Sequence, residues 1–228
     1  MKKKEEFSKL ILKWWKENKR DFSWRHFRDP YRILIAEFFL RKTTAKQVQR
    51  IYSTFIKKYP SPKDILKADF KELKKIIRPL GMEHKRAELL KKFAKVIVES
   101  YNGIIPLQKN ELMKLPGVGL YTANAVLTLS SGKDLPLLDT NFIRVIERVF
   151  DKKSKKSRAR TDKELWKFAE SLIPPRKGRE FNFAVLDLGA VICKPRDPKC
   201  ETCPLKVICI FYNTDQRGVI NEIRKGKD

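Results

Sequence analysis

Apolar residues recur at helical spacing through almost the whole chain. Near the N-terminus they return every three or four positions between lysines and glutamates, at Phe7, Leu10, Ile11, Trp14 and Trp15. This spacing predicts one amphipathic helix over residues 5–19. The same pattern predicts further helices over residues 30–39, 44–59, 62–77, 83–100 and 181–193. No segment has the alternation of a strand, so we expect an all-α fold.

Local signals mark several helix ends. Asp29 followed by Pro30 is typical of a helix start, because proline is accommodated in the first turn. Thr161 and Glu164 have the spacing of a capping box ahead of an apolar run. The basic stretch over residues 151–160 is predicted to be a solvated loop, or else a phosphate contact.

The charge balance indicates a polyanionic partner. The 228 residues include 52 Lys and Arg against 27 Asp and Glu, which gives a formal net charge of +25 and a pI near 10.0. Nucleic acid is the commonest partner of so basic a protein, although a lysine-coated surface without a partner has the same composition. With only four glutamines, the composition also hints at a thermophile.

The N-terminal segment does not resemble a signal peptide, because lysine and glutamate interrupt its apolar residues. No apolar run approaches the length needed to span a membrane. We therefore expect a protein located in the cytoplasm, with no membrane partner. We also expect it to be a monomer and to be associated with the nucleoid.

All four cysteines lie in one short window, with the spacing C-x6-C-x2-C-x5-C, at Cys193, Cys200, Cys203 and Cys209. Four thiolates from one short loop are the ligand set of a cubane iron–sulfur cluster. Zinc is the first alternative, but structural zinc sites usually use two close pairs of ligands, and only Cys200 and Cys203 form such a pair. Two disulfides are the second alternative and fit an intracellular protein poorly. The favoured cofactor is one 4Fe–4S cluster.

A second motif is the turn Pro116-Gly117-Val118-Gly119, between a short helix ending at Leu115 and a helix beginning at about Leu120. Glycines allow backbone conformations that side chains forbid, and they let a phosphate approach the amides at a helix N-terminus. Gly117 and Gly119 are therefore candidate contacts to a nucleic-acid backbone. The alternative is an ordinary helical hairpin whose glycines serve only the turn.

Twenty residues further on, Asp139 separates an apolar stretch from another helix, in "PLLDTNFIRVIERVF". An isolated aspartate at such a position is usually only a helix cap. The order of glycine turn, aspartate and cysteine cluster along one chain is far more specific than any of the three alone.

In these segments the chain resembles the helix-hairpin-helix DNA glycosylase superfamily, in its iron–sulfur branch. "LPGVGLYTANAV" resembles the family's hairpin, "LDTNFIRV" its catalytic-aspartate segment, and the four cysteines its cluster loop. The resemblance covers roughly residues 20–212. It implies an enzyme that flips a nucleotide out of double-stranded DNA and cleaves its N-glycosidic bond.

The resemblance also implies a division into two helical domains with a cleft between them for the flipped base. A six-helix barrel over residues 28–135 would contain the hairpin, at about residues 111–130. Residues 1–27 and 136–228 would form a discontinuous iron–sulfur domain with the cluster loop at residues 193–209.

Tyr121 decides the expected subfamily. Members resembling endonuclease III have a lysine nucleophile at this position, and a phenol cannot form a Schiff base. With "WRHFRDPYRILIAEFFLRKTT", the chain looks most like archaeal-type thymine-DNA mismatch glycosylases, which remove thymine or uracil opposite guanine. The resemblance thus implies a monofunctional glycosylase acting on double-stranded DNA with a mismatched or deaminated base. Alternatives are an adenine glycosylase, a bifunctional endonuclease III-like enzyme and a non-catalytic DNA-binding module.

The resemblance implies three residues at the reaction centre. Asp139 would stabilise positive charge on the sugar and orient or deprotonate the attacking water. Glu37 would hydrogen-bond the base or position water, or would only pair with Arg41 one helical turn later. Tyr121 would stack on the flipped base or contact a phosphate, or would only pack in the core.

Further residues are implied to contact the DNA. Arg41 and Lys42 would enter the vacated base stack or contact the opposite guanine, or would bind phosphate generally. Leu80 and Met82 would act as an apolar wedge between bases, or would only pack within their loop.

Overall fold

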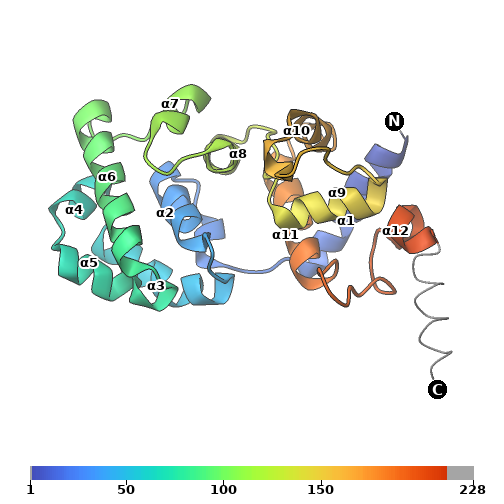
Figure 1. Ribbon diagram of the computed structural model, residues 1–228, viewed down its shortest axis with the longest axis horizontal. Coiled ribbons are helices and arrows are strands. Elements are labelled where there is room, and N and C mark those ends of the chain that lie inside the picture. The colour runs from blue at the N-terminus through green and yellow to red at the C-terminus, as the bar shows by residue number, and fades with distance from the viewer. Residues whose placement is uncertain (1, 215–228) are drawn as a thin grey trace, which may run out of the picture. The chain divides into compact units, whose positions relative to one another are not determined.

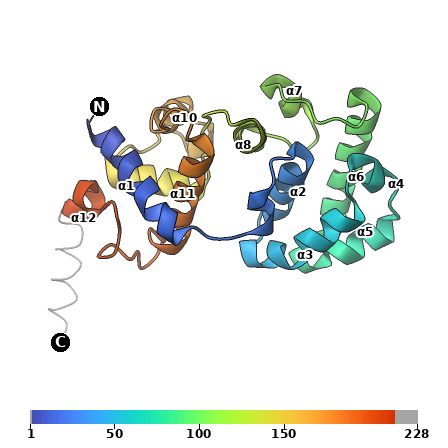
Figure 2. The same cartoon turned by 180° about the vertical axis from the view of Figure 1, so that it is seen from behind.

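The computed structural model describes residues 2–214. Figures 1 and 2 show helices joined by loops, and no strand occurs within this range. The all-α prediction is therefore confirmed. No helix in this range combines the length and the apolar character needed to cross a membrane.

The chain divides into two compact units, and the first is discontinuous in sequence. Unit 1 contains Met1–Arg20 and Asp134–Asp228, and unit 2 contains Asp21–Lys133. The domains that the resemblance implies have their junctions at residues 27/28 and 135/136. Residues 21–27 fall in unit 2 because the ring of Trp24, in the 3-10 turn Ser23–His26, packs edge-on against Tyr52 with 5.7 Å between centroids.

Unit 1 is built on an amphipathic helix that buries its apolar face, as its spacing predicts. Its α-helices in the described range are α1 (Lys2–Asn18), α9 (Thr140–Phe150), α10 (Lys163–Glu170), α11 (Gly178–Val191) and α12 (Ile210–Asn213). Phe7 and Ile11 of α1 are fully buried against residues of α9 and α11, including Phe142 and Phe181. The apolar contacts of α1 thus join the two sequence segments of unit 1.

A buried carboxylate also holds the end of α1. Asp187 of α11 is fully buried, and its oxygens accept hydrogen bonds from the Trp15 indole (2.9 Å) and the Arg20 guanidinium (2.6 Å). Buried charges are tolerated when they are paired and hydrogen-bonded. This contact fixes α1 to α11 at the point where the chain leaves for unit 2.

Unit 2 surrounds the apolar helix α2. Its α-helices are α2 (Pro30–Leu40), α3 (Ala45–Lys58), α4 (Pro62–Lys67), α5 (Phe70–Ile77), α6 (Glu83–Tyr101), α7 (Lys109–Lys114) and α8 (Leu120–Ser131). Asp29 caps α2 by accepting from the Arg32 amide at 2.7 Å, as the Asp-Pro pair predicts. Phe38 packs edge-on against Phe93, and α2 also packs against α8. The end of α2 is thereby brought to the glycine turn.

Two predicted helix boundaries are wrong. The single helix expected over residues 62–77 is two helices, because Asp69 starts a new one by accepting from the Glu72 amide at 2.8 Å. The expected capping box at Thr161 does not form, because Asp162 is the cap of α10 and accepts from the Glu164 amide at 3.0 Å. The Thr161 hydroxyl instead donates to the Arg158 carbonyl.

Candidate functional site

The glycine turn joins α7 to α8 as the sequence predicts. The chain leaves α7 at Leu115, turns through residues 116–119 and enters α8 at Leu120. Gly119 is the N-cap of α8, and no side chain caps this helix end. The first amides of α8 therefore lack the side-chain acceptor that most helix starts have, which suits them to an external anion.

The two glycines of the turn serve different purposes. Gly117 has φ +77°, a conformation that residues with a side chain rarely adopt, and a Cβ there would also lie 2.7 Å from a methyl group of Leu89, so the position favours glycine. Gly119 has φ −102° and ψ −177°, which any residue adopts, and a Cβ there would meet no atom within 4 Å. The expectation that both glycines are needed for backbone geometry is therefore wrong for Gly119, which faces open space.

Arg41 holds the turn from the end of α2. Its guanidinium donates to the Gly117 carbonyl and to the Thr122 hydroxyl (3.2 Å), and it lies over the ring of Phe38 at 5.0 Å. Burial lowers the pKa of Arg41, while the negative charge of Glu37, one helical turn earlier on α2, raises it. The Nη2 group of Arg41 thus donates both of these hydrogen bonds to acceptors within the protein.

Lys42 and Met82 meet at one surface pocket of about 200 Å³. Both side chains reach the surface, and Met82 is 49% exposed. Leu80, the other proposed wedge residue, is only 5% exposed. Of the two apolar candidates, Met82 is therefore the one that a partner could contact.

Glu37 and Tyr121 are both partly exposed residues of unit 2. Glu37 interrupts the apolar run of α2, and Tyr121 lies in the first turn of α8 directly after the glycine turn.

Asp139 is the N-cap of α9 in unit 1. Its carboxylate accepts from the Phe142 amide at 2.8 Å and from the Asn141 side-chain amide at 3.0 Å. Desolvation raises the pKa of Asp139 above its ordinary value, and these hydrogen bonds oppose the rise. The helix cap considered from the sequence is therefore present, and it orients a desolvated carboxylate.

Arg144 connects Asp139 to the cysteine segment. It donates to the Asn141 side-chain carbonyl (2.7 Å), the Gly189 carbonyl (2.7 Å) and the Cys193 carbonyl (2.7 Å). A Cβ on Gly189 would lie 2.6 Å from the Cβ of Asn141, so a glycine there makes room for this arrangement.

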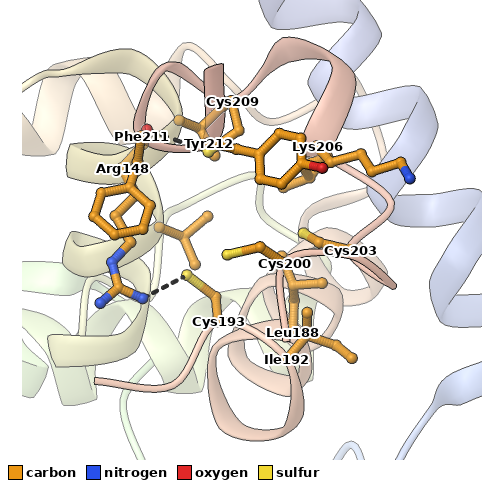
Figure 3. Close-up of a pocket in the computed structure, with 13 residues that line it drawn as sticks. Arg148, Leu188, Ile192, Cys193, Cys200, Cys203, Lys206, Cys209, Phe211 and Tyr212 are labelled. Atoms are coloured by element: carbon orange, nitrogen blue, oxygen red, sulfur yellow. Dashed lines mark hydrogen bonds between the residues drawn. The ribbon is translucent and has the colours of Figure 1, made fainter. Parts of the chain in front are cut away.

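The four cysteine side chains converge on one cavity (Figure 3). Cys193 follows α11, Cys209 is the N-cap of α12, and the loop between them supplies Cys200 and Cys203. Successive backbone bonds wrap this loop, from the Cys203 amide to the Cys200 carbonyl and from the Cys209 amide to the Lys206 carbonyl. All four residues are free thiols.

The charges around these thiols suit thiolate ligands. Arg148 donates to the Cys193 sulfur at 3.4 Å and to the Lys194 carbonyl at 2.7 Å. Desolvation raises the pKa of Cys203 to about 12. Within residues 2–214, no group of three or more His, Cys, Asp or Glu side chains is placed to hold a metal ion, so the four thiols line one cavity without forming a ready ligand set. The donor chemistry of four convergent thiols fits an iron–sulfur cluster.

The sequence did not point to four residues that contact the candidate site residues or line the pocket of Lys42 and Met82. These residues are Asn141, Arg144, Arg148 and Arg86. Asn141 and Arg144 are polar residues close to the start of an amphipathic helix and shortly after Asp139, which could have drawn attention to them. Arg86 is 8% exposed, and no sequence signal distinguishes it from the surface lysines and arginines around it.

Comparisons with known proteins agree with this geometry. Residues 35–171 match the family described as "HhH-GPD superfamily base excision DNA repair protein". A thymine/uracil-DNA glycosylase of Pyrobaculum aerophilum is 50% identical over 92% of this chain and 94% of its own length. An adenine DNA glycosylase of Buchnera aphidicola is 32% identical over 90% of this chain, which spans 59% of that protein. The solved structure of a thermostable thymine-DNA glycosylase has a TM-score of 0.88 at 44% identity, covering 92% of this chain and 97% of the other.

Proposed function

The chain belongs to the HhH-GPD superfamily of base excision DNA repair proteins, and we propose that it is a monofunctional DNA glycosylase. Its substrate is double-stranded DNA in which thymine or uracil is mispaired with guanine. The reaction hydrolyses the bond between the base and the deoxyribose. The relatives named thymine/uracil-DNA glycosylase support this choice, because their identity to the chain is higher than that of the adenine DNA glycosylases.

The observation that carries the catalytic proposal is the oriented, desolvated carboxylate of Asp139. Breaking the glycosidic bond builds positive charge on the sugar, and a fixed anion next to that charge lowers the barrier. The bond between C1′ and N1 of the pyrimidine breaks, and water forms a bond to C1′. The Asp139 carboxylate takes a proton from this water, and that proton neutralises the departing pyrimidine anion. The products are a free pyrimidine and an abasic site. The raised pKa of Asp139 makes it a better base for this water than an ordinary aspartate.

We also propose roles for two residues of unit 2. Tyr121 stacks on the flipped base, and because it offers no amine it cannot cleave the strand. Glu37 hydrogen-bonds the base or positions the water. A partly exposed carboxylate within an apolar helix is consistent with this role, since it can reach a ligand while remaining fixed by its helix.

The DNA backbone binds at the start of α8. Gly119 leaves space in front of amides that no side chain caps, and a phosphate can accept hydrogen bonds there. Such a contact positions DNA of any sequence. Lys42 and Met82 contact the mispair from their shared pocket.

The cysteine segment holds one 4Fe–4S cluster, with Cys193, Cys200, Cys203 and Cys209 as ligands. The cluster would supply structural cross-linking of the loop and no redox step in hydrolysis. Purified protein should then contain about four irons per chain. A Cys203→Ser variant should lose most of this iron, whereas stoichiometric zinc in active protein would contradict the cluster.

Base-release assays on end-labelled duplexes test the function. Duplexes with G·T, G·U, A·8-oxoguanine and thymine glycol are incubated with the protein and divided, and one half is treated with alkali. A fully paired duplex, treated in the same way, is the control. We expect alkali-dependent strand breaks in the G·T and G·U duplexes and none in this control. Release of adenine from A·8-oxoguanine without reaction at G·T or G·U would favour the adenine glycosylase instead.

A further inference from the structure

Arg86, on α6, is a buried arginine with four uncharged acceptors. It is 8% exposed, and its guanidinium donates to the carbonyls of Gly81 (2.8 Å), Phe38 (2.8 Å) and Arg41 (2.7 Å) and to the hydroxyl of Thr43 (2.6 Å). Burial lowers the pKa of Arg86, and the charge of Arg41 lowers it further, yet a guanidinium stays protonated. A buried charge costs free energy unless its hydrogen-bond donors have acceptors, and the Arg86 guanidinium has four of them.

The acceptors belong mostly to two loops that are far apart in sequence. One loop, residues 41–43, follows α2, and the other, residues 81–82, precedes α6. Each loop contains a residue other than glycine whose backbone is in the left-handed region. These residues are Lys42, with φ +52°, and Met82, with φ +54°. This conformation is unfavourable for residues other than glycine, so surrounding contacts must compensate for it.

The bonds of Arg86 lie next to both strained residues. It binds the carbonyl of Arg41 and the hydroxyl of Thr43, on either side of Lys42. It also binds the carbonyl of Gly81, directly before Met82. All three of Lys42, Met82 and Arg86 line the same pocket. One side chain thus fixes two loops whose exposed side chains face a common space.

We propose that Arg86 is a positioning residue that presents Lys42 and Met82 together to the mispaired bases. The proposal rests on the function proposed above. Without Arg86, each loop relaxes toward a backbone conformation of lower energy, and the two side chains no longer meet at one pocket. Recognition of a mispair then weakens, while binding to the DNA backbone through α8 persists.

Two variants and one control test this role. Arg86→Lys keeps the charge, but its single ammonium group cannot reach acceptors in both loops as the planar guanidinium does. Thr43→Val removes one acceptor and keeps the shape of the side chain, so it is expected to fold. Lys95→Ala is the control, because Lys95 lies on the same helix, is exposed and pairs with Glu99 only at 3.9 Å.

The measurement is the ratio of two dissociation constants in folded protein, checked by thermal unfolding. One duplex contains 2′-fluoro-deoxyuridine opposite guanine, which resists hydrolysis, and the other is fully paired. We expect the preference for the mispair to fall about tenfold in Arg86→Lys and about threefold in Thr43→Val. Changes of this size correspond to losing part of the difference in affinity that a protein shows for one base pair over another. Affinity for the paired duplex should stay within about twofold in every variant, as backbone binding requires.

An unchanged preference in both variants would overturn the proposal, as would an equal loss of affinity for both duplexes. If Arg86→Lys does not fold, Thr43→Val decides alone. Release of uracil from an ordinary G·U duplex by the wild type is scored separately. Absence of that release would refute the glycosylase function, and the binding ratio would still show whether Arg86 controls mispair recognition.

Discussion

The side-chain amide of Asn141 donates to the carboxylate of Asp139 at 3.0 Å, and this orientation of the amide is imposed by a neighbour. Arg144 has only donors and binds the Asn141 carbonyl at 2.7 Å, so the NH₂ group must face Asp139. The Asp139 carboxylate is therefore held by a side chain whose own direction is fixed. A fixed anion is what stabilisation of charge in a transition state requires.

Asp139→Asn is expected to abolish most catalysis and keep DNA binding. The substitution retains an oxygen for the Phe142 amide and removes the negative charge. We expect the single-turnover rate of uracil release to fall about a hundredfold or more, as for loss of a strong electrostatic stabiliser. Affinity for a G·U duplex should persist or rise slightly. Near-normal turnover would reduce Asp139 to a helix cap.

The raised pKa of Asp139 predicts the direction of two pH effects. The carboxylate is the active form, so the rate should rise with pH through a midpoint above that of an ordinary aspartate. A folded-state pKa above the unfolded value also means that the wild type loses stability, relative to Asp139→Asn, as pH rises through that pKa. Thermal unfolding of both proteins between about pH 4 and 7 measures this difference. A difference that moved the other way would show that hydrogen bonding outweighs desolvation at Asp139.

The two glycines of the turn should respond differently to alanine. Gly119→Ala has room and an ordinary backbone conformation, so its melting temperature should be unchanged, but its methyl group would stand where a phosphate approaches. Affinity should fall about tenfold for mispaired and paired duplexes alike, with a smaller salt dependence. Gly117→Ala should lower the melting temperature, since it adds strain at φ +77° and a clash with Leu89. Unaltered DNA affinity in Gly119→Ala would mean that the phosphate lies elsewhere.

Tyr121→Lys tests whether the start of α8 faces the sugar. The wild type should release a base and leave a strand that breaks only after alkali, because a phenol forms no imine. In the variant, an amine desolvated by the site could attack C1′, and borohydride would then trap the protein on DNA. Gel mobility of the treated complex is the measurement. Efficient trapping of the wild type would show that another lysine is the nucleophile.

Asp187→Asn should destabilise unit 1 without touching the proposed reaction centre. Arg20 and Trp15 would lose a charged acceptor that is fully buried, which costs on the order of 3 kcal/mol of unfolding free energy. Asp21→Asn is the matched control, because the Asp21 side chain is 79% exposed and should contribute less than about 0.5 kcal/mol. Denaturant unfolding of both variants measures the difference. Equal stabilities would mean that the α1–α11 contact depends on apolar packing alone.

Local patterns in the sequence were sufficient to predict most of the helices, the glycine turn and the clustering of the cysteines. Each of these features depends on residues that are close together in the sequence. Examples are the helical period, the cap at Asp29 and the spacing of the cysteines. What could not be predicted depends on contacts between distant segments. Burial separates Leu80 from Met82, although they are two residues apart, and nothing in the sequence connects Arg86 with Phe38 or Thr43.

The same limit applies to Gly119 and Asp139. A glycine in a turn suggests a backbone requirement, but only the structure shows that Gly119 has an ordinary conformation and faces open space. An aspartate before a helix suggests a cap, and only the structure adds the amide of Asn141 and the desolvation that raises the pKa.

The discontinuity of unit 1 has a consequence for synthesis on the ribosome. Residues 21–133 form a continuous unit that can fold as soon as they emerge, whereas α1 emerges before them and packs against α11, more than 150 residues later. Until α11 is made, Phe7 and Ile11 have no core to enter, and the lysines and glutamates of α1 keep the nascent helix in solution. Translation rate and chaperone access should therefore affect closure of α1 on α11 more than formation of the glycine turn.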